Sequence, residues 1–152
     1  MKSLERFKKE YQCYFNKDFL LAYYVITEAL LMADSRVKNM MIATWGKGTH
    51  NYIDKDGNPA TSNNYIFYPI FYDMDTMLGL DNTGDNRFSY YDEDTNPSIY
   101  NGEDVLWNFV RDTLSLEIDA MYTDLEAAGL NINKEQGGGW SPSSILPYFN
   151  QN

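Results

Sequence analysis

One long, almost uncharged helical segment constrains the fold of this chain more than any other feature. Apolar and aromatic residues recur at helical spacing from Phe19 to Leu31, and Glu28 is the only charged residue among them. A helix that is apolar on nearly all sides has to be buried. We therefore predict a buried helix that begins after Asn16 or Asp18 as N-cap and runs to Ala33, with the rest of the chain packed around it.

Two shorter apolar segments have the length and composition of strands. The first is Met40 to Trp45, and the second is Tyr65 to Tyr72, in which Pro69 requires an edge position or a bulge. Gly46 to Asn64, between them, is rich in turn-forming residues, and its Asp56-Gly57-Asn58-Pro59 core is a strong turn signal. We expect this segment to join two antiparallel strands.

Helical patterns flank the strands at residues 2–15, 103–111 and 114–128, while residues 81–102 lack apolar periodicity and are expected to form a long functional or partner-ordered loop. The predicted fold class is therefore α+β, with a buried helix, a small antiparallel sheet and a helical C-terminal half. The predicted organisation is an N-terminal helical arm at 1–15, one domain at 16–136, and a Gly-rich hinge with a short C-terminal helix at 137–152.

Composition excludes several classes of protein. The length of 152 residues fits one domain, and 16% aromatic residues are too many for a disordered chain. A formal charge of −10 disfavours direct binding to nucleic acid, which requires clustered cations. No apolar run approaches the roughly 20 residues that span a bilayer, and the N-terminus is charged, so we expect a chain without a signal peptide or membrane contact.

The chain has too few cysteine and histidine residues for most transition-metal sites. Cys13 is the single cysteine and His50 the single histidine, so neither a disulfide scaffold nor a His-rich metal cluster can form within the chain. Any divalent metal would be held by oxygen ligands. The expected metal is therefore Mg²⁺ or Ca²⁺.

A set of polar side chains follows the buried helix and the second strand. Asp34 comes directly after the apolar helix, where the macrodipole disfavours a carboxylate, and Arg36 and Asn39 follow it; Asp73 and Asp75 end the second strand. This is the order of parts in a kinase catalytic lobe, where an Asp orients the acceptor hydroxyl, a cation neutralises the phosphoryl group, and Asn and Asp hold Mg²⁺. The alternative is that all five are ordinary cap and turn residues.

The same residues resemble a known family. Residues 30–39 (LLMADSRVKN) and 66–79 resemble the spore-coat CotH-type atypical kinases, and IFYDMDTMLGLDNTG followed by 101–107 resembles CotH-like segments of large bacteriophage virion proteins. The resemblance covers 16–128 and implies a kinase C-lobe-like fold. It implies Asp34 as the catalytic-loop Asp, Asn39 and Asp73 as metal ligands, and Asp75 as a further acidic ligand.

The chain departs from the kinase pattern in three places. Met32 and Ala33 stand where a His would precede the catalytic Asp, and Asp73-Met74-Asp75 replaces Asp-Phe-Gly. Only 33 residues precede Asp34, and they contain no glycine-rich loop and no strand Lys for a nucleotide. ATP could be enclosed only if another chain supplied the missing lobe.

Two functions follow as expectations. The favoured one is a structural or assembly component of a phage-like virion, such as a tail or portal-vertex protein, located in the virion or host cytoplasm and oligomeric with other protein chains. The alternative is the catalytic lobe of a Mg²⁺-dependent atypical protein kinase, with Asp34 and Arg36 as catalytic residues and Asn39, Asp73 and Asp75 on the metal. Tyr90, Tyr91, Tyr100 and Trp107 are expected to form either a contact surface or core packing beneath the long loop.

Overall fold

Helix α2 (Lys17–Ala29) lies at the centre of the computed structural model, as its apolar sequence predicts. The structure describes residues 2–30, 32, 35–36, 39–74, 77 and 105–127. Asn16 is the N-cap, and its side chain accepts a hydrogen bond from the Phe19 N–H at 3.0 Å. The helix ends at Ala29 with Leu30 as C-cap, four residues before the predicted end, because the chain turns there and the Met32 N–H bonds the carbonyl of Thr27.

The described residues form an α+β fold with four α-helices and two small antiparallel sheets. The predicted N-terminal helical arm is divided into an α-helix and a short 3₁₀ turn, and the two predicted C-terminal helices are present. The other elements are α1 (Lys2–Glu10), η1 (Tyr11–Cys13), β1 (Met41–Lys47), β2 (His50–Ile53), β3 (Pro59–Ser62), β4 (Tyr65–Ile70), α3 (Val105–Thr113) and α4 (Ser115–Ala127).

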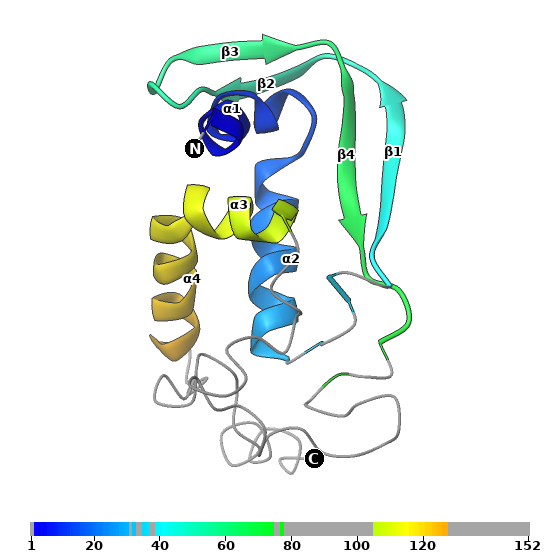
Figure 1. Ribbon diagram of the computed structural model, residues 1–152, viewed down its shortest axis with the longest axis vertical. Helices are drawn as coiled ribbons and strands as arrows, with labels where there is room; N and C mark the ends of the chain where they lie inside the picture. The colour runs from blue at the N-terminus through cyan, green and yellow to red at the C-terminus, as the bar shows by residue number, and fades with distance from the viewer. Residues whose placement is uncertain are drawn as a thin grey trace.

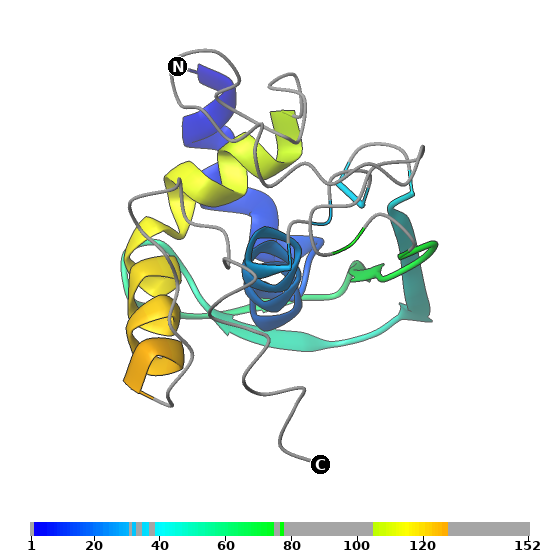
Figure 2. The same ribbon diagram turned by 90° about the horizontal axis from the view of Figure 1, so that it is seen from below.

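The hydrophobic core lies where α2 meets the helices on one side of it. Leu20, Tyr23 and Val25 of α2 are fully buried together with Trp107 of α3. Figures 1 and 2 show α4 on one side of α2 and β1 on the other. The core is completed by Tyr11, Leu21, Tyr24, Val110, Leu114 and Ile118.

Strands β1 and β4 pair antiparallel, as the sequence predicts, with a register running from Met41 opposite Ile70 to Lys47 opposite Tyr65. The connection between them is more ordered than the predicted turn-rich segment, because its ends pair with each other as β2 and β3. The predicted turn closes this hairpin. Asp54 Oδ1 accepts hydrogen bonds from the backbone N–H groups of Asp56 and Asn58 at 2.9 and 2.8 Å.

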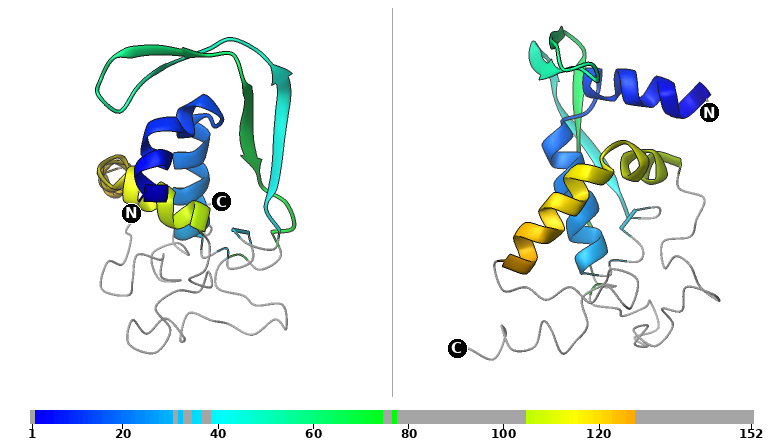
Figure 3. Two further views of the ribbon diagram at one scale, coloured as in Figure 1. Left: turned by 45° about the horizontal axis from the view of Figure 1, so that its top comes forward. Right: turned by 90° about the vertical axis from the view of Figure 1, so that its left-hand side faces the viewer.

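The four strands make one bent two-stranded ribbon. Its lower arm, β1 and β4, runs beside α2, and its upper arm, β2 and β3, arches over α1 (Figures 1 and 3). The register shifts between Thr44 and Lys47, and Gly46 in this bulge has a φ of +104°. Such a bulge bends a ribbon and strengthens its twist.

Strand β4 is held from both sides. Along one edge it pairs with β1, and along the other Phe67 exchanges backbone hydrogen bonds with Tyr14 and Asn16. This bridge reaches only Phe67, so Pro69 lies beyond it at an edge, as its missing N–H requires. Among the residues that the structure describes, β1 has β4 as its only neighbouring strand.

The described part of the chain contains no helix that combines the length and apolar character needed to cross a membrane. The predicted loop at 81–102 and the predicted region 137–152 lie outside the described residues.

Candidate functional site

The predicted catalytic and metal-binding residues are described only in part. Asp34 and Asp75 lie outside the described residues. Asn39 precedes β1 and Asp73 follows β4, and because Met41 is paired with Ile70, both residues lie at the same end of the ribbon. Asp73 is exposed and has a φ of +51°. Within the described ranges there is no group of three or more His, Cys, Asp or Glu residues placed to hold a metal ion.

Arg36 is buried, with 5% of its surface exposed, at the C-terminal end of α2. Its guanidinium donates to Thr27 Oγ1 at 2.9 Å and to the Tyr24 carbonyl at 2.8 Å. It also forms an ion pair with Glu28 at 2.8 Å. The cation therefore satisfies the acceptors at the end of α2, and a role on a phosphoryl group would require its side chain to leave this cluster.

Aromatic rings enclose the Arg36 cluster. The guanidinium carbon lies 4.1 Å from the centroid of the Tyr24 ring, and Trp107 Nε1 donates to the Arg36 carbonyl at 3.1 Å. Tyr23 stacks between Phe71 and Trp107, and its hydroxyl donates to the Ser35 carbonyl at 2.5 Å. Burial raises the pKa of Tyr23 to about 12 against the opposing effect of Arg36, so this hydroxyl stays protonated at neutral pH. Of the two roles predicted for Trp107, contact surface or core packing, the structure therefore shows core packing.

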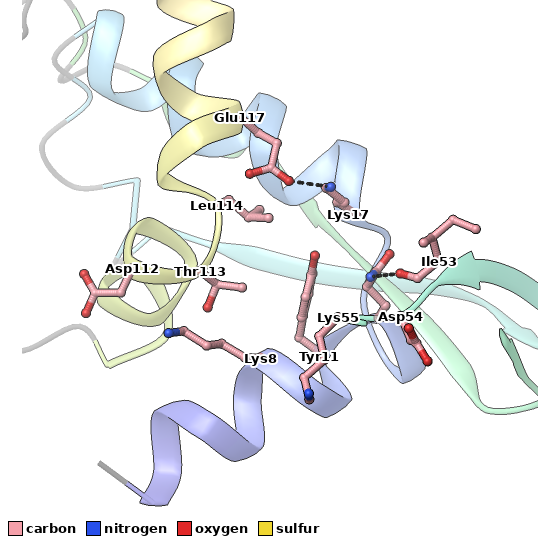
Figure 4. Close-up of a pocket in the computed structure, with 11 residues that line it drawn as sticks. Lys8, Tyr11, Lys17, Ile53, Asp54, Lys55, Asp112, Thr113, Leu114 and Glu117 are labelled. Carbon is pink, nitrogen blue, oxygen red and sulfur yellow. Dashed lines mark hydrogen bonds and ion pairs between the residues drawn. The ribbon is translucent and has the colours of Figure 1, made fainter. Parts of the chain in front are cut away.

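A cavity of about 470 Å³ lies where η1, the β2–β3 turn and the α3–α4 junction meet (Figure 4). Gln12 Nε2 donates to the Ile53 carbonyl across it at 2.6 Å, and Lys17 is paired with Glu117 at 2.6 Å. Lysines and carboxylates line it in equal number, so charge gives it no clear ligand preference. They are Lys8, Lys17, Lys55, Asp54, Asp112 and Glu117.

Two groups in this cavity have shifted pKa values. Burial acts to raise the pKa of Glu117, but the hydrogen bonds from Lys17 and from the backbone, with the Lys17 charge, lower it overall. Burial raises the pKa of the Tyr11 phenol, and the charges of Glu117 and Asp18 add to this effect. Tyr11 therefore stays neutral and serves as a wall of the cavity, not as a base.

Large apolar side chains remain exposed along the lower arm of the ribbon. We call the set formed by Met41, Ile42, Trp45, Tyr65 and Ile70 the ribbon surface. Trp45 is 95% exposed, and the other four are each exposed by 43% or more. Neither 41–53 nor 59–70 contains a carboxylate, although the whole chain carries a formal charge of −10. The ribbon surface is thus an apolar, acid-free region of an acidic protein.

Sequence reasoning did not identify the ribbon surface, although a signal for it was present. The second strand is apolar on both faces, which in a sheet covered by helices would indicate burial on both sides. Because the sheet has only two strands, and the structure packs β4 rather than β1 against α2, part of this apolar surface stays in contact with solvent. The absence of Asp and Glu from the strands of an acidic chain was the sequence signal that pointed to this surface.

Comparisons with protein-family models, with curated proteins and with solved structures found no match.

Proposed function

We propose that this chain is a structural or assembly component, and that its ribbon surface binds another protein chain. The observation that carries the proposal is the almost fully exposed indole of Trp45 among further exposed apolar side chains on one arm of the ribbon. Full burial of one large apolar side chain is worth about 1.5 to 3 kcal/mol. Exposed apolar side chains that gather on one part of a protein, here the five of the ribbon surface, are typical of an interaction site.

The shape of the ribbon supports the same role. An isolated two-stranded ribbon is at best marginally stable in water, yet here it is tied to the helices. Ser62 Oγ donates to the Cys13 carbonyl at 2.8 Å, and the Tyr68 ring meets the edge of Phe19 with centroids 5.0 Å apart. One contact lies on each arm, so the ribbon as a whole is held against the helices, which lowers the entropic cost of binding a partner.

The proposed setting is a phage-like virion, and it rests on the resemblance of residues 70–84 and 101–107 to CotH-like segments of large virion proteins. In that setting the chain is a CotH-like half-domain that contributes architecture. Its partners are other protein chains of the particle.

The experiment compares two exposed apolar residues. The chain is co-expressed with the products of its neighbouring genes, and complexes are isolated through a tag on this chain. We expect Trp45→Ser to weaken a defined complex about tenfold, by the logic of an exposed aromatic anchor. Leu116→Ser, 80% exposed on α4 across α2 from β1, is the matched control. Equal effects of the two substitutions, or none, would contradict the proposal.

A second candidate function is the catalytic lobe of a Mg²⁺-dependent atypical protein kinase. Its specific support is the register that brings Asn39 and Asp73 to the same end of the ribbon, where they offer two oxygen ligands of the kind Mg²⁺ prefers. In this proposal Asp34 accepts the proton of a Ser or Thr hydroxyl as that oxygen takes the γ-phosphoryl group of ATP and ADP leaves. ATP would be held between this chain and a second one.

The kinase proposal is tested with the chain and its co-expressed neighbours. We expect Mg²⁺-dependent phosphate transfer that is lost in Asp34→Ala and in Asp73→Ala and retained in Asp56→Ala, a carboxylate on the distant hairpin turn. Absence of transfer from the assembled chains would exclude this function. It would leave the assembly proposal intact.

A further inference from the structure

We propose that the partner on the ribbon surface is a second copy of this chain, joined edge to edge along β1 in an antiparallel, two-fold symmetric pair. This inference rests on the proposed assembly function and specifies its partner. The result would be a four-stranded sheet in the order β4, β1, β1 of the second copy, β4 of the second copy.

The backbone of β1 provides the first argument. Among the described residues its inner edge pairs with β4, and no strand pairs with its outer edge. An edge strand presents a row of unpaired N–H and C=O groups that another strand can complete. β4 cannot take this role at Phe67, because Tyr14 and Asn16 already bond that residue.

The side chains of β1 are complementary in size to themselves. With Thr44 on the two-fold axis, antiparallel pairing sets Ala43 and Ile42 of one copy alongside the Trp45–Gly46 bulge of the other, and the bulge confines regular ladder bonds to the residues next to the axis. Trp45 and Ile42 therefore each lie beside a small residue of the second copy, Ala43 or Gly46. The two threonines face each other at the axis, a pairing that favours sheets. The exposed indole of Trp45 would cover the second copy's Ala43.

Charge also permits this contact. Two copies of a chain with a formal charge of −10 repel each other over most surfaces. β1 and β4 carry no carboxylate, and their single charge is Lys47. In the two-fold pair the two lysines lie at opposite ends of the interface, each opposite Met41 of the other copy. Each lysine thereby approaches the ribbon end at which Asp73 lies.

Sedimentation measures the association. We expect a concentration-dependent dimer for the whole chain, and a dissociation constant raised about tenfold in Trp45→Ser, because symmetry removes two cross-strand contacts at once. Leu116→Ser is the control, since Leu116 is 80% exposed but lies on α4, away from the ribbon surface. Trp45 makes so little contact within its own chain that its replacement leaves the fold unaffected.

Cross-linking tests the register. In a Cys13→Ser background, which keeps a hydroxyl beside the Tyr52 phenol, Thr44→Cys places one thiol of each copy at the two-fold axis. A short thiol-reactive cross-linker should join the two chains through it. Thr61→Cys, on the exposed outer hairpin, should give no such product. A dimer that cross-links through Thr61→Cys and not through Thr44→Cys would overturn the β1 pairing.

The outcomes separate this inference from the proposed function on which it rests. If the chain sediments as a monomer at about 100 µM, its dimer is too weak to form at ordinary concentrations, and the proposed pairing of two copies is wrong. If Trp45→Ser then still weakens a complex with a different chain and Leu116→Ser does not, the assembly function stands. If the chain neither forms a dimer nor loses a complex with a different chain through Trp45→Ser, both the dimer and the assembly function are wrong.

Discussion

Arg36 stabilises the end of the central helix, although its position in the sequence suggests a role in phosphate binding. Its place two residues after Asp34 matches a phosphate-neutralising cation, but the structure buries it against the last turn of α2. There its guanidinium donates hydrogen bonds to the Thr27 hydroxyl and the Tyr24 carbonyl and forms an ion pair with Glu28. A buried ion pair is costly to break, because removal of one partner leaves the other charged and without compensation.

Replacing this arginine should therefore destabilise the protein strongly. We expect Arg36→Met to lower the free energy of unfolding by about 3 to 5 kcal/mol, measured by urea denaturation. Arg111→Met is the control, because Arg111 is 56% exposed beside Asp112 and its loss should cost less than about 1 kcal/mol. Adding Glu28→Gln to Arg36→Met should restore part of the lost stability. Similar costs for both arginine variants would show that the cluster has no special role.

At the scale of elements, the ribbon owes its shape to a single irregularity. Trp45 and Gly46 form the bulge between Thr44 and Lys47, and the positive φ of Gly46 is a conformation that a side chain disfavours. The Thr44 hydroxyl accepts a hydrogen bond from the Gly46 N–H at 3.2 Å, which helps to fix the bulge. The bend that follows directs the outer hairpin over α1 (Figure 3).

Gly46→Ala should affect the bulge through its backbone alone, since a Cβ at this position meets no atom within 4 Å. We expect a loss of about 1 kcal/mol in the free energy of unfolding. Gly48→Ala, two residues on, also has open space but no positive φ and should be close to neutral. Urea denaturation of both variants makes the comparison. A larger loss in Gly48→Ala than in Gly46→Ala would contradict this account of the bend.

At the scale of the whole molecule, Trp107 joins parts of the chain that are far apart in sequence. It lies on α3, stacks on Tyr23 of α2 with centroids 5.1 Å apart, and bonds the Arg36 carbonyl. Tyr23 in turn stacks on Phe71, just past β4. One indole thus connects the C-terminal helices, the central helix and, through Tyr23, the base of the ribbon.

Trp107→Ala should accordingly weaken the entire fold. We expect a loss of about 3 to 5 kcal/mol in the free energy of unfolding, as for other large aromatic residues removed from a core. Trp45→Ala, the exposed counterpart, should change it by less than about 0.5 kcal/mol. Thermal and urea unfolding followed by circular dichroism measure both. A Trp107 variant as stable as the Trp45 variant would place the core elsewhere.

Several features of this fold could be predicted from the sequence because they depend on local pattern. The nearly uncharged run from Phe19 predicts α2 as a buried helix, and Asp56-Gly57 predicts the hairpin turn, where Gly57 has a φ of +85°. The antiparallel pairing of β1 with β4 follows from the turn-rich composition of the segment that connects them, with its Asp56-Gly57-Asn58-Pro59 core. The pairing of β2 with β3 was missed because their polar, turn-rich sequence resembles a loop and is stabilised by contacts with η1, such as Gln12 to Ile53.

The sequence alone determined the helical segments, the strands β1 and β4 and the turn at Asp56-Gly57, since these depend on side-chain periodicity and on residues a few positions apart. Only the tertiary structure decided which of these surfaces stay in contact with solvent. Packing of α3 and α4 on one side of α2 covers Trp107 and Arg36, whereas the outer strand of a two-stranded ribbon leaves Trp45 exposed. Burial depends on which elements meet across long distances in the sequence, and no local pattern encodes that.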